Sequence, residues 1–342
     1  MSSSPLPNGA RDVRGDHCER GPIYESLCPL AGESVSPTRV ALVTGATGFV
    51  GEHLVRRLLV DGWETHAVVR PSSNATSVCT ALGRDNVHVH DGSIVGLIDI
   101  LCSVHPDIVF HLASVLVAEH FTGDVDPLVQ SNILFGVQLL EAMTVAGVST
   151  IVNTGTTGQH YEGREYSAVS LYAATKQAFQ DILQFYCEVR GVCAMTLELP
   201  NTYGPGDRSP KLFSLLDRAA RSGETLQMSP GEQLLDLLHV DDVVHGYEVA
   251  ADALLSGNLP PASQYRLSSR SLVRLKDVVE LYRQATGDTI SIVWGGRPYR
   301  VREVMKPVSP VPVLPKWQAC ISLKDGFATL EAESQEDGDG SD

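Results

Sequence analysis

Short apolar runs alternate with helical patterns along most of this chain. An apolar run at residues 39–43 leads through a glycine-rich turn into apolar residues at helical spacing, up to Asp61-Gly62. Further runs predict strands at 66–69, 87–90, 108–111, 150–153 and 194–197, and the clearest helices between them span 132–146 and 171–189. This alternation predicts an α/β fold, a doubly wound parallel sheet of Rossmann type with helices on both faces.

The pattern becomes less regular after residue 200. It predicts helices at 212–220, 243–255 and 275–286, and strands at 233–239, 265–267 and 290–293. We therefore expect a Rossmann domain over 39–200 and a smaller C-terminal α/β substrate domain over 201–330, with part of 233–265 returning to the first domain. Residues 1–38 lack an apolar period and residues 331–342 are strongly acidic, so both segments are expected to be disordered.

Composition and charge exclude several classes of protein for this chain. With 342 residues, 43% of them hydrophobic, the chain can bury a substantial core. Its 26 basic and 41 acidic residues give a net charge of −15, which repels nucleic acid and anionic membranes, so neither is an expected partner. Seven scattered cysteines with no CxxC pair are typical of a reducing cytosol, and no leader or membrane span is evident. We expect a cytoplasmic protein without a metal site.

A glycine-rich turn follows the first strand. Gly45, Gly48 and Gly51 recur at three-residue intervals where a helix begins. A pyrophosphate can approach such a backbone closely, and the free amide groups of the helix N-terminus attract anions. The turn Thr44–Gly51, with Thr47, Phe49 and Val50, therefore predicts a dinucleotide site.

The end of the second strand discriminates between the two nicotinamide cofactors. Arg70 stands there, followed by the hydroxyl side chains of Ser72 and Ser73, with no acid between Val68 and Thr80. A base at this position suits the 2′-phosphate of NADP, whereas an acid suits the ribose hydroxyl of NAD. We therefore expect NADPH rather than NAD. Asp91, after the third strand, is placed either to contact the adenine or to serve as a plain loop carboxylate.

Two further groups carry candidate chemistry. Tyr172 and Lys176 lie four residues apart at the start of a predicted helix, so their side chains share one face. A neighbouring ammonium would lower the pKa of the phenol and allow proton transfer near neutral pH. Upstream, a hydroxyl at the end of the fifth strand can bond a substrate oxygen; strand phase favours Thr156, with Thr157 as the alternative.

Taken together, these motifs and the segment 201–206, Asn-Thr-Tyr-Gly-Pro-Gly, resemble an extended short-chain dehydrogenase/reductase over about residues 39–330. Segments 153–161, 171–177, 239–242 and 294–300 resemble more narrowly the nucleotide-sugar branch, and especially 4-ketoreductases of 4-keto-6-deoxy sugars. The resemblance implies a nucleoside-diphosphate sugar bound between two domains, deoxysugar biosynthesis, and a homodimer formed through two helices of each subunit.

The resemblance also implies roles for individual residues. Thr156, Tyr172 and Lys176 would be catalytic. The expected cofactor contacts comprise Gly45, Thr47, Gly48, Phe49, Val50, Gly51, Arg70, Ser72, Ser73, Asp91, Gly92, Leu112, Ala113, Ser114, Tyr172, Lys176 and Pro200. The expected substrate contacts comprise Thr156, Thr157, Asn201, Lys211, Leu212, Arg297 and Arg300.

The chain departs from many relatives at three places. Glu198 and Leu235 stand where relatives carry arginine, and the stretch from Thr156 to Tyr172 is short. Sugar 4,6-dehydratases resemble one another in an acidic pair after the catalytic threonine, which is absent here. Our preferred hypothesis is NADPH-dependent reduction at C4 of a TDP- or CDP-linked 4-keto-6-deoxyhexose. The alternatives are an NAD(P)-dependent nucleotide-sugar epimerase and a non-catalytic redox sensor that binds NADP.

Overall fold

The computed structural model describes residues 38–209, 211–257 and 259–330. The expected N-terminal extension, apart from Thr38, and the expected acidic tail lie outside the described residues. Nothing in the structure therefore bears on those two predictions.

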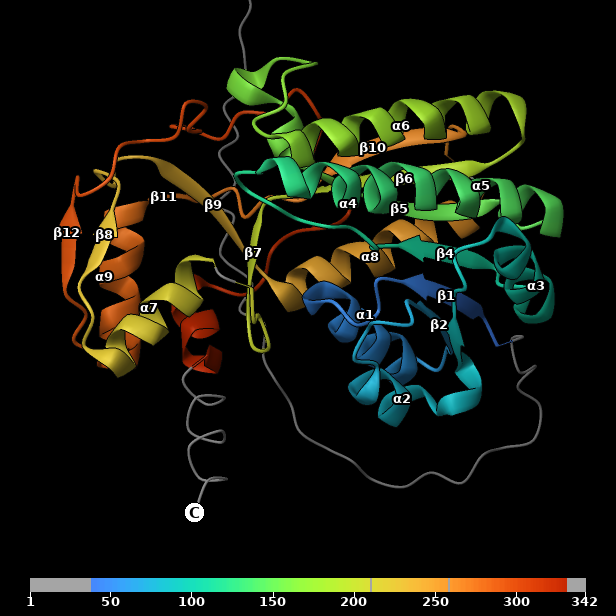
Figure 1. Cartoon of the computed structure of the whole chain (residues 1–342), viewed down its shortest axis with the longest axis horizontal. Coiled ribbons are helices and arrows are strands. Elements are labelled where there is room, and N and C mark those ends of the chain that lie inside the picture. The colour runs from blue at the N-terminus through green and yellow to red at the C-terminus, as the bar shows by residue number, and fades with distance from the viewer. Residues whose placement is uncertain (1–37, 210, 258, 331–342) are drawn as a thin grey trace, which may run out of the picture. The chain divides into compact units, whose positions relative to one another are not determined.

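A seven-stranded parallel sheet forms the centre of the described chain (Figure 1). Its strand order is β10-β6-β5-β4-β1-β2-β3. The strands are β1 (Val40–Thr44), β2 (Glu64–Val69), β3 (Val87–Val89), β4 (Ile108–His111), β5 (Thr150–Thr156), β6 (Cys193–Leu199) and β10 (Ala262–Arg266). The order reverses between β1 and β4, which pair with Thr44 opposite His111. The carboxyl edge at such a reversal is where doubly wound sheets bind ligands, and the six strands expected before residue 200 are all present.

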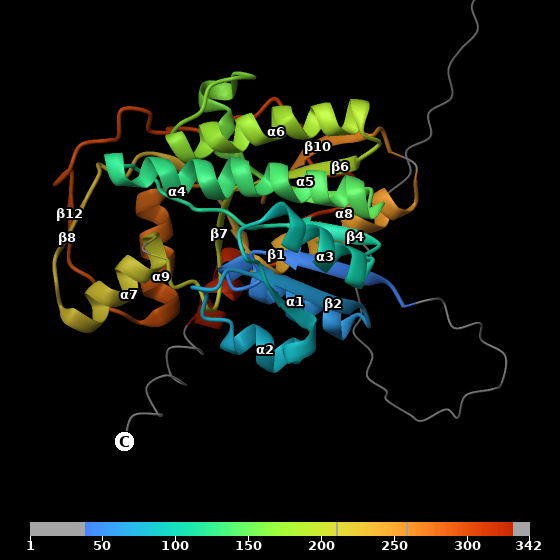
Figure 2. The same cartoon turned by 45° about the vertical axis from the view of Figure 1, so that its right-hand side comes forward.

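Helices cover both faces of this sheet, as the apolar patterns predict. One face packs against α1 (Phe49–Val60), α2 (Thr76–Leu82) and α8 (Val240–Leu255). The other packs against α3 (Ile94–Val104), α5 (Phe135–Ala146) and α6 (Leu171–Val189). Figure 2, turned by 45°, shows α5 and α6 side by side over the sheet. The Rossmann-type fold class is therefore confirmed.

The helix expected from Asn132 begins earlier than the pattern indicates. It starts with α4 (Val125–Val129) and passes through a π-helical turn, Gln130–Leu134, before α5. By length and composition, the helical run Thr122–Ala146 could cross a membrane. In the fold its parts pack against α3 and α6.

A smaller group of elements follows the main sheet and contains its own apolar core. Two small sheets belong to it, ordered β11-β9-β7 and β12-β8. The elements are β7 (Asn201–Tyr203), α7 (Leu212–Ser222), β8 (Leu226–Met228), β9 (Leu234–His239), β11 (Leu272–Arg274), α9 (Leu275–Thr286) and β12 (Ile292–Trp294). Tyr203, Phe213, Tyr282 and Phe327 make ring contacts at its centre. Of the segment 233–265, α8 packs against the main sheet and most of β10 pairs within it, whereas β9 belongs to the smaller group.

Candidate active site

A cavity of about 1560 Å³ opens at the carboxyl edge of the main sheet. Side chains from both groups of elements line it, so residues distant in sequence share one space. Among the predicted site residues, those lining it are Gly45, Gly48, Phe49, Val50, Gly51, Leu112, Ser114, Thr156, Thr157, Tyr172, Pro200, Asn201, Lys211, Leu212, Arg297 and Arg300. The predicted residues Thr47, Arg70, Ser72, Ser73, Asp91, Gly92, Ala113 and Lys176 are not part of its lining.

The glycine turn has the shape that a pyrophosphate requires. Gly45 has φ +75°, and a Cβ there would lie 2.5 Å from the Ala113 nitrogen. A Cβ on Gly51 would lie 2.1 Å from the Gly45 carbonyl oxygen, so this glycine lets α1 pack against the turn. A Cβ on Gly48 would meet only the Gly45 oxygen, at 3.2 Å, and Gly48 lines the cavity. Because no side chain caps the N-terminus of α1, its amide groups are available to an anion.

The residues expected around the adenosine half lie on the surface beyond β2 and β3. Arg70 is exposed, and its carbonyl oxygen accepts a hydrogen bond from the Ser73 amide at 3.0 Å, which forms a tight turn. Asp91 accepts from the amide and hydroxyl groups of Ser93, at 2.8 and 2.7 Å, where α3 begins. These bonds, the first causes of a lowered Asp91 pKa, give Asp91 a structural role in the turn before α3.

Tyr172 stands in the first turn of α6 and faces the cavity. The helix begins after Ser170, whose hydroxyl accepts from the Ala173 amide at 3.3 Å. Burial raises the pKa of Tyr172 to about 12, while a hydrogen bond with Ser114 acts in the opposite direction. Tyr172 therefore keeps its proton at neutral pH, so the expectation of a phenol with a lowered pKa differs from what the structure shows.

Lys176 lies one turn further along α6, with a side chain that is buried beneath the cavity wall. Burial lowers its pKa to about 8. Its neighbour His111 shares a 2.8 Å hydrogen bond with Thr44, and burial together with the charge of Lys176 lowers the pKa of His111 to about 3. Lys176 contributes no shift to the pKa of Tyr172, because the causes of that shift are burial and Ser114.

The two candidate threonines differ in their hydrogen bonds. Thr156 ends β5; its hydroxyl oxygen accepts from the Gly158 amide at 3.2 Å, and among the described residues its hydroxyl hydrogen has no acceptor. The Thr157 hydroxyl donates to the Leu199 carbonyl at 3.4 Å. Thr156 is therefore the one with a proton left to offer to a ligand in the cavity.

The predicted substrate-side residues come from the smaller group of elements. Lys211, the cap residue of α7, lies 3.4 Å from Asp207 and 5.9 Å from the centre of the Phe49 ring. Arg300 forms an exposed ion pair with Glu119 at 3.2 Å. Both basic groups line the same cavity as the glycine turn, and each is paired with an acid.

Several polar residues near the site were not predicted. Asn132, His160 and Tyr247 carry no local motif; Tyr247 shares a 2.6 Å hydrogen bond with Thr154 below the strand end. Glu198 is a signal in the sequence, because it replaces an expected arginine. It is fully buried and bonded to His160.

Comparisons with known proteins agree with this geometry. The model of the NAD dependent epimerase/dehydratase family matches residues 41–261. CDP-abequose synthase of Salmonella muenchen is 24% identical over 84% of this chain and 96% of its own length. UDP-glucose 4-epimerase of Mycolicibacterium smegmatis is 30% identical over 60% of this chain and 71% of its own length.

Among solved structures, MoeE5 in complex with UDP-glucuronic acid and NAD has a TM-score of 0.73 and 26% identity. The likeness covers 87% of this chain and 99% of that one.

Proposed function

Because the chain belongs to the NAD dependent epimerase/dehydratase family, in the nucleotide-sugar branch of the extended short-chain dehydrogenases/reductases, we propose that it is a 4-ketoreductase. Its substrate is a CDP- or TDP-linked 4-keto-6-deoxyhexose, which it reduces at C4 with NADPH. The observation that carries this proposal is that Tyr172 lines the cavity with Thr156 and keeps its proton at neutral pH. A protonated hydroxyl in this place is the acid that the reduction of a keto group needs.

The residues of the cavity have complementary roles in this reaction. Thr156 donates its free hydroxyl hydrogen to the C4 oxygen and holds it as negative charge develops there. Tyr172 gives its proton to that oxygen. Lys176, buried one turn further along α6, would bind the ribose of the nicotinamide. When bound, the reduced nicotinamide supplies the hydride.

Two observations disfavour the elimination of water, which the dehydratases of this family carry out. Thr157 and Gly158 follow Thr156, so the turn offers no acid for the elimination of water. The carboxyl of Glu198, which lies beside Gly155 in the register of β5 and β6, is bonded to His160 and is fully buried. Curated relatives that include three CDP-abequose synthases support a CDP-linked deoxy sugar as the substrate class.

The preference for NADPH rests on Arg70. Its guanidinium, with Ser72 and Ser73 beside it, suits a 2′-phosphate, and no acid follows β2 before Thr80. The glycine turn would hold the pyrophosphate through the backbone of Gly48, Phe49 and Val50.

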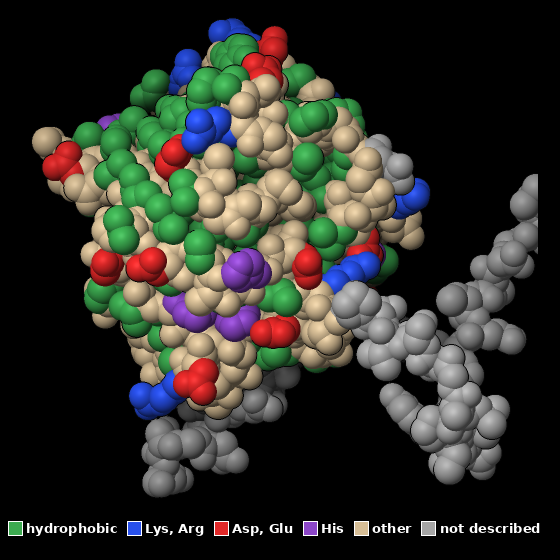
Figure 3. Space-filling model, turned by 90° about the vertical axis from the view of Figure 1, so that its right-hand side faces the viewer, with side chains coloured by type: hydrophobic (Ala, Val, Ile, Leu, Met, Phe, Trp, Pro, Cys, Tyr) green, Lys and Arg blue, Asp and Glu red, His purple; other side chains and the backbone are tan. Residues whose placement is uncertain are grey.

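We also propose a cytoplasmic homodimer that pairs through α5 and α6. Val145, Phe185 and Val189 on these helices are 58%, 53% and 61% exposed. Figure 3 shows hydrophobic side chains gathered in the upper part of the face at the right of Figure 1, where these helices end. A monomeric mass in sedimentation equilibrium would contradict the dimer, and recovery in a cell's membrane fraction would contradict the location.

Turnover measurements test the function directly. Purified protein with NADPH and a panel of CDP- and TDP-4-keto-6-deoxyhexoses should lose reduced-nicotinamide absorbance in proportion to product, and Tyr172→Phe should abolish most of that loss. A rearranged sugar without net cofactor loss would indicate an epimerase. Cofactor binding with no turnover of any sugar would indicate a sensor.

A further inference from the structure

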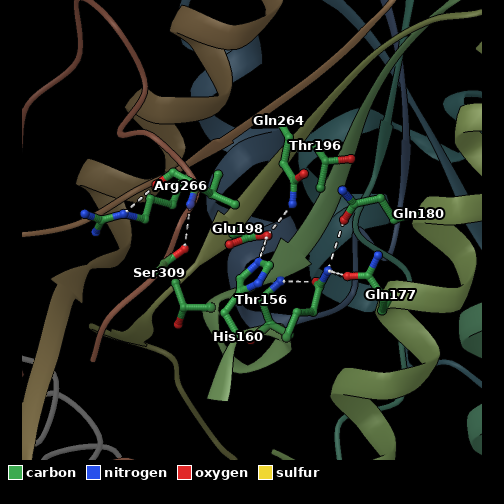
Figure 4. Close-up of polar contacts among 12 residues, drawn as sticks. Thr156, His160, Gln177, Gln180, Thr196, Glu198, Gln264, Arg266 and Ser309 are labelled. Carbon is green, nitrogen blue, oxygen red and sulfur yellow. Dashed lines mark hydrogen bonds and ion pairs between the residues drawn. The ribbon is translucent and has the colours of Figure 1, made fainter. Parts of the chain in front are cut away.

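A buried histidine–carboxylate pair lies next to the turn that follows Thr156, and its histidine also lines the cavity (Figure 4). His160 Nε2 is 2.7 Å from Glu198 Oε1, and the two side chains are 3% and 0% exposed. Gln264 of β10 donates to the same oxygen, while Glu198 Oε2 has no partner among the described residues. Neither His160 nor Glu198 has a role in the reaction proposed above.

The partners of His160 determine where its protons lie. Nδ1 is 3.1 Å from the main-chain carbonyl oxygens of Arg164 and Glu165, which only accept hydrogen bonds, so Nδ1 carries a hydrogen. Nε2 faces a carboxylate, and a second proton must lie between them. If that proton leaves, a nitrogen lone pair faces a buried carboxylate anion and the contact becomes repulsive.

One side of this pair is connected to Thr156 through the neighbouring residue. Gln159 Oε1 accepts from the Thr156 amide at 2.9 Å, and Gln159 Nε2 donates to Gln177 and Gln180 of α6, each at 3.0 Å. Gly155 makes this packing feasible, because a Cβ there would lie 3.1 Å from both Gln159 Oε1 and Glu198 Cγ. The end of β5 is thus fixed to the helix that carries Tyr172.

The other side of the pair organises the connection from Thr156 to Tyr172. The carbonyl groups of Arg164 and Glu165, which accept from His160 Nδ1, lie midway along this loop. The loop returns along its own start, with the Ser167 amide donating to the Gln159 carbonyl at 3.2 Å and the Val169 amide donating to the Gly158 carbonyl at 2.9 Å. It then reaches the cap of α6 at Ser170. His160 is therefore the side chain on which both halves of the loop meet.

We propose that His160, held by Glu198, is a positioning residue that fixes Thr156 and Tyr172 relative to each other, and that this placement depends on the proton shared by the pair. The inference rests on the proposed function only for the identity of the two reacting hydroxyl groups. Reaction rates are sensitive to such placement, because a displacement of about 1 Å can cost about 100-fold in rate.

The proposal has a direction in pH. Burial lowers the pKa of His160, but the hydrogen bond and charge of Glu198 and the two carbonyl groups outweigh it and raise that pKa above its usual value. The bonds of His160 to Glu198 and to the two loop carbonyl groups, which we call the clamp, are thus intact below the raised pKa and are lost as pH rises through it. Besides Glu198, the charged group on the neighbouring strand is Arg266, which pairs with Glu198 in register and donates to the Val311 carbonyl at 2.9 Å. Arg302 lies 5.1 Å from the centre of the Tyr161 ring and donates to the Ala168 carbonyl of the same loop. The α6 side chains bonded to Gln159 are the amides of Gln177 and Gln180.

Two substitutions separate the proton from the packing. His160→Ala removes the clamp, so kcat should fall about 10- to 100-fold while the Kd for NADPH is unchanged.

In Glu198→Gln the new side-chain amide donates one hydrogen to Nε2 of a neutral His160 ring and the other to Gln264, whose amide flips to accept it. The contact therefore survives without a titratable proton. The kcat ratio of this variant to wild type should be near one at the acidic end of the profile, below the pKa of the pair, and should rise with pH as the wild-type pair loses its proton. Loss of the Lys176 proton is common to both proteins and cancels in the ratio. His88→Gln, at the opposite edge of the sheet, is the matched control.

Hydrogen exchange of segment 156–170 tests the clamp without any turnover. Compared at equal pH, wild type should lose protection relative to Glu198→Gln as pH rises, and His160→Ala should have low protection throughout. Equal protection of wild type and Glu198→Gln at every pH, or full protection in His160→Ala, would overturn the inference. If wild type reduces no 4-keto sugar, the proposed function fails while the exchange result still decides this one.

Discussion

The side-chain amide of Asn132 donates to the Thr175 hydroxyl at 3.0 Å, directly beside Lys176 in α6. The same amide nitrogen donates to the Val115 carbonyl at 3.0 Å, and its oxygen accepts from the Val115 amide at 2.8 Å. Asn132 lies in the π-helical turn Gln130–Leu134 and is 2% exposed. It therefore connects the chain after β4, which contributes Ser114, to the helix of Tyr172.

Replacing Asn132 with alanine should destabilise the fold. The change removes the bonds of Asn132 to the part-buried amide and carbonyl groups of Val115 and to the buried Thr175 hydroxyl, and a polar group left unsatisfied when buried costs about 1–3 kcal/mol. We expect the free energy of unfolding, measured by urea denaturation, to fall by at least about 1 kcal/mol. Gln130→Ala, at an exposed position of the same turn, should change it by less than about 0.5 kcal/mol. Equal losses in the two variants would show that the Asn132 bonds contribute nothing of their own.

Thr156 and Thr157 should differ sharply in their effect on catalysis. Thr156 has a hydroxyl hydrogen free to donate, whereas that of Thr157 is bonded to the Leu199 carbonyl. Loss of one donor to a developing oxyanion costs about 100- to 1000-fold in kcat, so Thr156→Val should fall in that range and Thr156→Ser should restore most of the rate. Thr157→Val should remain within about tenfold of wild type, because it loses one neutral hydrogen bond. Steady-state kcat with the preferred 4-keto sugar measures both, and a larger loss at Thr157 would reverse the assignment.

Local sequence patterns are enough to predict the main sheet and its helices, because each expected strand and helix before residue 200 has its own apolar period. The glycine turn is also local: the close approaches of Gly45 and Gly51 follow from three-residue spacing at a strand–helix junction. The placement of β9 and β10 is not local. β9 is a short apolar run and β10 is mostly polar. Only their pairing, β10 with β6 and β9 with β7 and β11, assigns them to different sheets.

In the candidate site, too, local sequence predicts some features and the tertiary fold alone determines others. Tyr172 and Lys176 are four residues apart on one helix, so sequence alone places them together. Their pKa values depend on burial by the rest of the fold, which is why the phenol has a raised pKa instead of the expected lowered one. His160 and Glu198 are 38 residues apart and meet only because β5 and β6 are neighbours.

Arg70 provides the last test, because it alone decides the proposed choice of cofactor. The side chain follows β2 and is exposed, so removing it should affect binding and leave the fold intact. A charge-assisted hydrogen bond contributes about 1.5–3 kcal/mol, which corresponds to roughly 10- to 100-fold in affinity. Arg70→Ala should therefore raise the Kd for NADPH by that factor and leave the Kd for NADH almost unchanged, as measured by fluorescence titration. Arg84→Ala, an exposed arginine before β3, is the control for nonspecific charge. Parallel weakening of both cofactors in Arg70→Ala would mean that Arg70 does not contact the 2′-phosphate, and the preference for NADPH would then have no support in this chain.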